Sequence, residues 1–220
     1  MEKLTLAGAL TGGIIAMLIF AGAGYSGIAM LAAFFITGTG ATAWKKEEKQ
    51  QFKLADDHTK RNAGQVLANG GVAAITGMLI LLFPAQTAVF QLIMAASLSS
   101  AMADTLSSEL GMVFGRRFYN IISWKKDTRG LDGVISLEGT LIGVAGSFVI
   151  AVIYALGFGW NINFLWILIA GTIGNLSDSV LGALFERKNY LNNDAVNFLN
   201  TMVAALAAGL CTILCQNILK

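Results

Sequence analysis

The strongest constraint on this chain is a series of apolar runs, each close to the length needed to cross a membrane. A hydrocarbon core of about 30 Å requires about 20 helical residues at 1.5 Å per residue. The runs that approach or reach this length are 4–23, 25–43, 63–83, 87–103, 139–156, 162–184 and 195–216. We therefore expect residues 1–220 to form a single integral membrane domain, an all-α polytopic bundle of about seven transmembrane helices.

The composition excludes the other classes of chain. Charged residues make up 13% of the 220 residues and hydrophobic residues 55%, whereas a soluble domain carries about 25% charged residues. A chain this apolar does not remain a disordered linker, because it can bury enough surface to collapse. The net charge of +2 gives no indication of a nucleic-acid partner, and none is predicted.

The basic residues predict the orientation of the chain. Fourteen of the 15 Lys and Arg lie at the N-terminus or in three charged loops, about 44–62, 104–138 and 185–194, and the connections 84–86 and 157–161 carry no charge. The positive-inside rule makes the charged face cytoplasmic. We expect a cytoplasmic N-terminus, an external C-terminus and residence in the cytoplasmic membrane of a prokaryote. His58, in the first loop, is expected in solvent and without a catalytic role.

Polar side chains recur at helical spacing near the charged face. Arg61, Gln65 and Asn69 follow one another by four and so share one side of a helix. Three further stripes are Asp104/Ser107/Ser108/Gly111, Gly171/Asn175/Asp178/Gly182 and Asn193/Asn197/Asn200/Thr201. Polar groups within a membrane segment are candidates for function by default. Hydrogen bonding between helices is the alternative interpretation of the amides and hydroxyls.

Two carboxylates and a cationic loop predict phosphate chemistry. Asp104 and Asp178 need a cation or a partner at membrane depth, and Mg²⁺ favours one or two carboxylates plus phosphate oxygens. After the helix expected over 104–115, whose glycines leave one side bare, the loop carries Arg116, Arg117 and Arg129 beside glycines. Arginine and glycine amides suit phosphate binding, and lipid head-group contact is the alternative for Lys125 and Lys126. The chain has no P-loop motif.

Four strings in order give the chain a family resemblance: GQVLANGG at 64–71, ADTLSSELG at 103–111, DSVLG at 178–182 and NDAVN at 193–197. They resemble the integral membrane family known as domain of unknown function 92, which includes a chloroplast phytyl-phosphate kinase. More distantly, Asp104, Gly111, Gly115 and the 136–139 string resemble CTP-dependent dolichol and phytol kinases and phosphatidate cytidylyltransferase. The lysine of their motif is Ile135 here, and Arg129 is the candidate substitute.

The resemblance implies CTP-dependent phosphoryl transfer, assisted by Mg²⁺, to an isoprenoid lipid such as a prenyl or phytyl monophosphate or alcohol. A CTP-dependent cytidylyltransferase and a transporter that uses intramembrane carboxylates remain alternatives, and a homo-oligomer is left open. Asp104, Glu109 and Asp178 are the candidate catalytic residues, and Asp104 and Asp178 the candidate metal ligands. The candidate nucleotide or phosphate ligands are Arg61, Asn69, Ser107, Arg116, Arg129, Asp132, Ser136, Asn175, Ser179, Asp194 and Asn197.

Overall fold

The computed structural model describes residues 4–51 and 60–218, with side chains as far as Thr212. Lys3, Lys53, His58 and Lys220 lie outside the described residues, so the predictions for them are not addressed. The elements are α1 (Leu6–Ala43), α2 (Lys46–Gln50), α3 (Ala63–Leu82), the 3-10 turn η1 (Pro84–Gln86), α4 (Thr87–Phe114), β1 (Tyr119–Asn120), β2 (Val134–Ile135), α5 (Leu137–Phe158), α6 (Asn163–Leu181), the π-helical turn η2 (Gly182–Glu186) and α7 (Asn193–Ile218).

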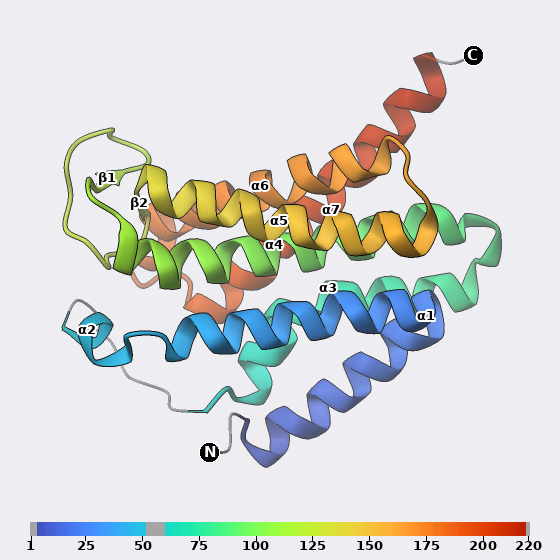
Figure 1. Ribbon diagram of the computed structural model, residues 1–220, viewed down its shortest axis with the longest axis horizontal. Helices are drawn as coiled ribbons and strands as arrows, with labels where there is room; N and C mark the ends of the chain where they lie inside the picture. Colours follow the sequence, from blue (N-terminus) through green and yellow to red (C-terminus); the bar gives the residue numbers. More distant parts are fainter. Residues whose placement is uncertain (1–3, 52–59, 219–220) are drawn as a thin grey trace.

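The described chain has six helices long and apolar enough to span a membrane, one fewer than the expected number. The difference lies in α1, which contains both of the first two predicted runs. These runs meet at Gly24, whose φ of 57° and ψ of −145° are not helical. Such a backbone conformation is adopted almost only by glycine. Figure 1 shows that α1 folds back at this point, so its two halves form a V-shaped hairpin.

Helix α4 is the centre of the bundle and packs against α1, α3, α5, α6 and α7. Its middle, from Met94 to Ala103, is buried without interruption. Most of these residues are Ala or Ser, and small side chains let neighbouring helices approach closely. Because α4 is enclosed on all sides, its polar residues can contact several helices at once.

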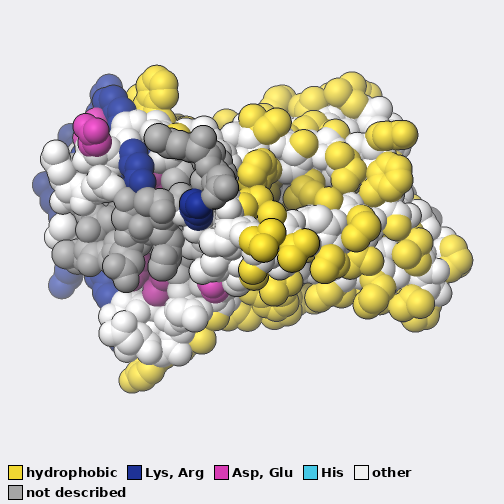
Figure 2. Space-filling view, turned by 90° about the horizontal axis from the view of Figure 1, so that it is seen from below, with side chains coloured by type: hydrophobic (Ala, Val, Ile, Leu, Met, Phe, Trp, Pro, Cys, Tyr) yellow, Lys and Arg dark blue, Asp and Glu magenta, His cyan; other side chains and the backbone are white. Residues whose placement is uncertain are grey.

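The polar residues gather at one end of the molecule. Figure 1 places α2, β1 and β2 together at that end, and α7 finishes at the opposite end. Figure 2 shows Lys and Arg side chains at the same end, with hydrophobic side chains covering the rest of that face. The structure thus separates a charged end from an apolar body, as the charge pattern predicts.

The glycines at the end of α4 serve helix packing. A Cβ on Gly111 would lie 2.9 Å from the Cα of Gly139, so α4 and α5 meet backbone to backbone. Ser136 caps the start of α5, where its Oγ accepts a 3.1 Å hydrogen bond from the amide of Gly139. The side of α4 that the sequence left bare near Gly111 is therefore filled by α5.

Candidate functional site

A relay of polar side chains joins α4, α6 and α7 near the charged end. The Ser100 Oγ donates a 2.9 Å hydrogen bond to Asn200 Oδ1, and Asn200 Nδ2 donates a 2.7 Å bond to Asp178 Oδ1. The carboxyl group of Asp178 is also within hydrogen-bonding range of that of Asp104. Asn200 is fully buried, so these bonds offset the cost of removing its amide from water.

The pair Asp104 and Asp178 has the chemistry of a cation site. Two carboxylates this close cannot both be ionised without a bound cation or a shared proton between them. Both residues are only partly buried by their exposed surface. No group of three or more His, Cys, Asp or Glu converges as a metal site within 4–51 and 60–212. Two carboxylates are a donor set that would suit Mg²⁺, which binds through few carboxylates and completes its shell with phosphate and water oxygens.

Glu109, the third candidate catalytic residue, is in an ion pair that the sequence did not indicate. Lys49 Nζ lies 2.5 Å from Glu109 Oε2, and both residues are buried. The same ammonium donates to the backbone oxygens of Ala41 and Thr42 at 2.8 and 2.9 Å. Lys49 thus satisfies carbonyls at the end of α1, where cations are favoured, and ties α2 to α4.

Arg61 lies just before α3, between α1 and α4. Its Cζ is 5.8 Å from the centroid of the Phe34 ring, in the range of a cation–π contact. A Cβ on Gly38 would lie 3.3 Å from both an Arg61 nitrogen and the Thr105 methyl carbon, so Arg61 is close to the residue that follows Asp104. Burial lowers the pKa of the Arg61 guanidinium, and the charge of Glu109 opposes that shift. Arg61 is a partly desolvated cation near Thr105 and Glu109 of α4.

The three candidate phosphate-binding arginines do not line one cavity. Arg116 is exposed, and its Nε lies 4.0 Å from Glu138 Oε1. It lines a pocket of about 200 Å³ together with Arg117, Phe118, Lys126 and Asp127. Arg61 lines a separate cleft. Arg129 lines neither the pocket nor the cleft. Its Nη2 lies 3.8 Å from Glu48 Oε1, and its Cζ lies 5.6 Å from the centroid of the Phe118 ring. The acidic partners of Arg116 and Arg129 lie on different elements, Glu138 on α5 and Glu48 on α2.

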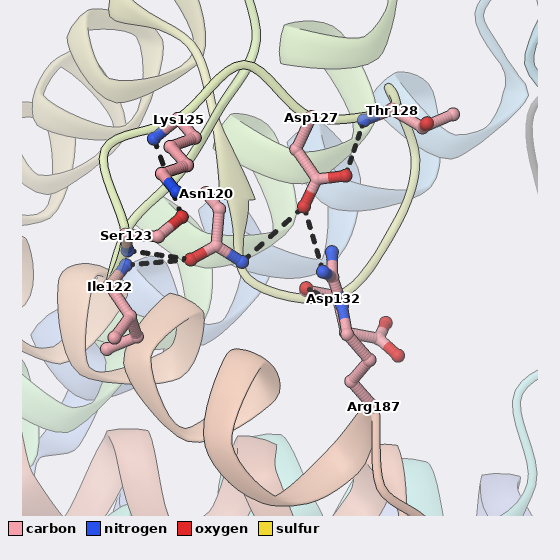
Figure 3. A network of polar contacts seen from close by, with 8 residues as sticks. All are labelled: Asn120, Ile122, Ser123, Lys125, Asp127, Thr128, Asp132 and Arg187. Atoms are coloured by element: carbon pink, nitrogen blue, oxygen red, sulfur yellow. Dashed lines mark hydrogen bonds and ion pairs between the residues drawn. The ribbon is translucent and has the colours of Figure 1, made fainter.

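The connection between α4 and α5 is fixed to the end of α6 by the network in Figure 3. Arg187 Nη1 donates a 2.8 Å bond to Asp127 Oδ2, and Arg187 Nε a 3.1 Å bond to the backbone oxygen of Asp132. The bond from Arg187 lowers the pKa of Asp127, whereas burial raises the pKa of Asp132. Gly133, at φ 74°, packs against Ala183 of η2 where a side chain has no room. This glycine therefore positions the loop.

The remaining predicted residues fall into two groups. Ser107 and Asn175 meet at Gly143 of α5, next to Asp104, and Asn197 is buried on α7. The second group consists of four predicted residues that lie elsewhere. The Ser136 Oγ is engaged as a helix cap, Ser179 is partly buried on α6, Asn69 lines the cleft with Arg61, and Asp194 lies against Gly64 at the start of α3.

Sequence reasoning missed Lys49, Asn200, Arg187 and Glu186 as members of the site region. Glu186 interacts electrostatically with Asp104, Asp132 and Asp178. Asn200 stood in a recognised polar stripe, so its spacing from Asn197 was a usable signal. Lys49 and Arg187 belong to charged segments, and nothing in the local sequence distinguishes a buried lysine from its solvated neighbours.

Comparison with known families identifies the family of the chain. The model of the family described as integral membrane protein DUF92 matches residues 1–205. The chain belongs to this family. It is 36% identical over 200 residues to the uncharacterized membrane protein MJ0933 of Methanocaldococcus jannaschii, covering 90% of this chain and 82% of that protein.

Two further relatives come from photosynthetic organisms. Protein VTE6, chloroplastic, of Arabidopsis thaliana is 31% identical over 193 residues, covering 84% of this chain and 58% of the plant protein. The uncharacterized membrane protein sll0875 of Synechocystis is 30% identical over 208 residues, covering 90% of this chain and 78% of that protein. No solved structure matches the chain.

Proposed function

We propose that this protein transfers the γ-phosphoryl group of CTP to an isoprenoid lipid, either a prenyl or phytyl monophosphate or the alcohol, at the charged end of the bundle. The observation that carries the proposal is the partly buried pair Asp104 and Asp178, linked to Asn200, with the cation Arg61 near Thr105 on the same helix as Asp104. The resemblance to a phytyl-phosphate kinase supports an isoprenoid acceptor. The charged end is then the cytoplasmic end, where CTP is present.

In this reaction the acceptor oxygen forms a bond to the γ-phosphorus while the bond to the β-phosphate oxygen breaks, and CDP leaves with the electron pair. Mg²⁺ held by Asp104 and Asp178 would neutralise charge on the transferred group. Arg61 would bind the acceptor phosphate, and Arg129 the nucleotide phosphates. Phosphoryl transfer depends mainly on positioning and charge neutralisation, which these residues supply. A monophosphate acceptor is already an anion and needs no general base.

The test is incubation of the purified protein with CTP labelled in the γ-phosphate and a panel of prenyl alcohols and monophosphates. The proposal predicts transfer of the label to the lipid and release of CDP. Release of pyrophosphate, with CMP joined to the lipid, would instead identify a cytidylyltransferase. Proton-coupled uptake into liposomes that Asp178→Asn abolishes, without turnover of CTP, would identify a transporter and overturn the proposal.

A further inference from the structure

The α1 hairpin and α3 enclose an apolar cleft of about 410 Å³. Its walls come from both halves of α1, over 9–16 and 28–35, and from α3. The hairpin is closed at Gly24, and in Figure 1 its two halves diverge toward the charged end, where Leu4 and Arg61 line the cleft. The cleft thus runs from the charged end into the level of the apolar helices.

One side of the cleft is polar. Arg61, Gln65 and Asn69 all line it. Gln65 and Asn69 share a face of α3 as their spacing predicts, but the prediction was wrong for Arg61, which precedes the helix in extended backbone. Arg61 is the one charged residue among the described residues that line it. Asn69 Nδ2 donates to the Gln65 carbonyl at 3.0 Å, but the buried Asn69 Oδ1 has no hydrogen-bond partner within the described residues. The polar groups of the cleft therefore lie on α3 and just before it, and its charge lies at Arg61.

We propose that this cleft binds the hydrocarbon tail of a single-chain prenyl monophosphate, with its phosphate at Arg61 and next to Asp104. The inference rests on the proposed function and adds the site of its lipid substrate. Apolar walls match the tail, and the lone cation at the membrane boundary matches one anionic head group. Arg61 and Thr105 both approach Gly38, so that head group would lie near the residue that follows Asp104.

The dimensions of the cleft determine which part of the lipid is recognised. The lining residues of α3 extend from Gln65 to Gly70, about 8 Å at 1.5 Å per residue, and Arg61 lies just before the helix. A long prenyl chain exceeds this length, so its terminal units lie in the bilayer. Recognition therefore concerns the head group and the isoprene units next to it, and affinity becomes independent of length once the cleft is filled.

Gly13 offers a substitution that occupies the cleft without disturbing the bundle. A Cβ at Gly13 meets no atom within 4 Å, and Gly13 lines the cleft. Gly40 on the same helix also has no atom within 4 Å of a Cβ, but it does not line the cleft. Gly13→Leu and Gly40→Leu thus add the same side chain to α1, inside and outside the proposed site.

The experiment uses a prenyl monophosphate with a photoreactive diazirine in the first isoprene units, added to the purified protein without CTP. We expect labelled peptides from α1 and α3, labelling weakened roughly tenfold by Gly13→Leu because the new side chain overpacks the cleft, and no change in Gly40→Leu. Arg61→Gln should make the phosphate probe label no better than the matching prenyl alcohol probe.

Three results would overturn the inference. One is labelling confined to α5, α6 or α7, and another is labelling that Gly13→Leu leaves intact. The third is equal competition by a two-chain phosphatidic acid, which would assign the cleft to ordinary bilayer lipid. Because labelling needs no CTP, it is independent of turnover. A protein that labels in the cleft but releases no CDP would retain this site and lose the kinase assignment.

Discussion

The ammonium of Lys49 lies 2.5 Å from the carboxylate of Glu109, and it joins a five-residue helix outside the spans to the central helix of the bundle. Both side chains are removed from water, so each charge depends on the other. The pair also lies beside Arg61, whose guanidinium feels the charge of Glu109. The pair therefore links α2, the end of α1 and α4 at the charged end, close to Arg61.

Replacement of Lys49 tests this link. Lys49→Met should lower the free energy of unfolding in detergent by about 3–5 kcal/mol, because the buried Glu109 carboxylate loses the ammonium that lies 2.5 Å from it. The thermal midpoint measures the effect. Lys45→Met is the control, since the Lys45–Glu48 pair is exposed and should contribute about 1 kcal/mol or less. The double change Lys49→Met/Glu109→Gln should recover much of the loss; an equally unstable double variant would contradict the pairing.

The carboxylate pair is tested by Asp104→Asn. This change keeps the size of the side chain and removes a ligand charge, so turnover of CTP should fall by about two orders of magnitude or more. The thermal midpoint should change little. Ser108→Ala, on an exposed position of the same helix, is the control and should leave turnover unaltered. Full activity of Asp104→Asn in detergent would refute the metal assignment.

Arg129 is expected to act on the nucleotide. Arg129→Ala should raise the KM for CTP by about ten- to a hundredfold, the equivalent of one charge-assisted hydrogen bond, with a smaller effect on kcat. Steady-state kinetics with CTP varied at saturating lipid measures it. Lys188→Ala, an exposed cation in the connection between α6 and α7, provides the comparison. An effect on the lipid KM alone would remove Arg129 from the nucleotide site.

The anchor between Asp127 and Arg187 should depend on pH. Since Arg187 lowers the pKa of Asp127, the anchor is fully present above the ordinary aspartate pKa of about 3.9 and is lost as pH falls through the lower folded-state value. Proteolysis of the connection at 115–136 should therefore accelerate in that acidic range. In Asp127→Asn the connection should be cleaved rapidly at every pH, because the ion pair with Arg187 is absent. Asp132 is unchanged in this variant, so any pH dependence that comes from its own titration should remain. Identical profiles for the two proteins would contradict the anchor.

The backbone contact of α4 with α5 predicts a packing penalty. Gly111→Ala would place its Cβ 2.9 Å from the Cα of Gly139, and relieving this should cost about 1–3 kcal/mol. Gly40→Ala, in open space on α1, should instead be neutral or mildly stabilising, because alanine favours helix. Thermal midpoints of the two variants, compared with the parent, give the difference. A stable Gly111→Ala protein would argue against the close approach.

The sequence alone determined the class of protein and which of its segments are apolar and which are charged. Apolar runs of spanning length require helices in a bilayer, because backbone groups there must be bonded within the segment. The fourfold spacing of Gln65 and Asn69 likewise required a shared helical face, which the cleft confirms, whereas Arg61 lies before the helix and reaches the cleft from extended backbone. These features follow from local periodicity and composition, and so they could be predicted without a partner helix.

Tertiary structure decided which polar groups meet. Asp178 contacts Asn200 and Asp104 only because α4, α6 and α7 converge, and no local signal encodes that convergence. The same holds for Lys49, which resembles its solvated neighbours until α2 folds onto α4. Gly111 and Gly133 show the same dependence on tertiary structure. At each position the space that a Cβ would take is filled by another segment of the chain, Gly139 of α5 for Gly111 and Ala183 of η2 for Gly133. Periodicity sets a face, whereas packing between distant segments determines what that face contacts.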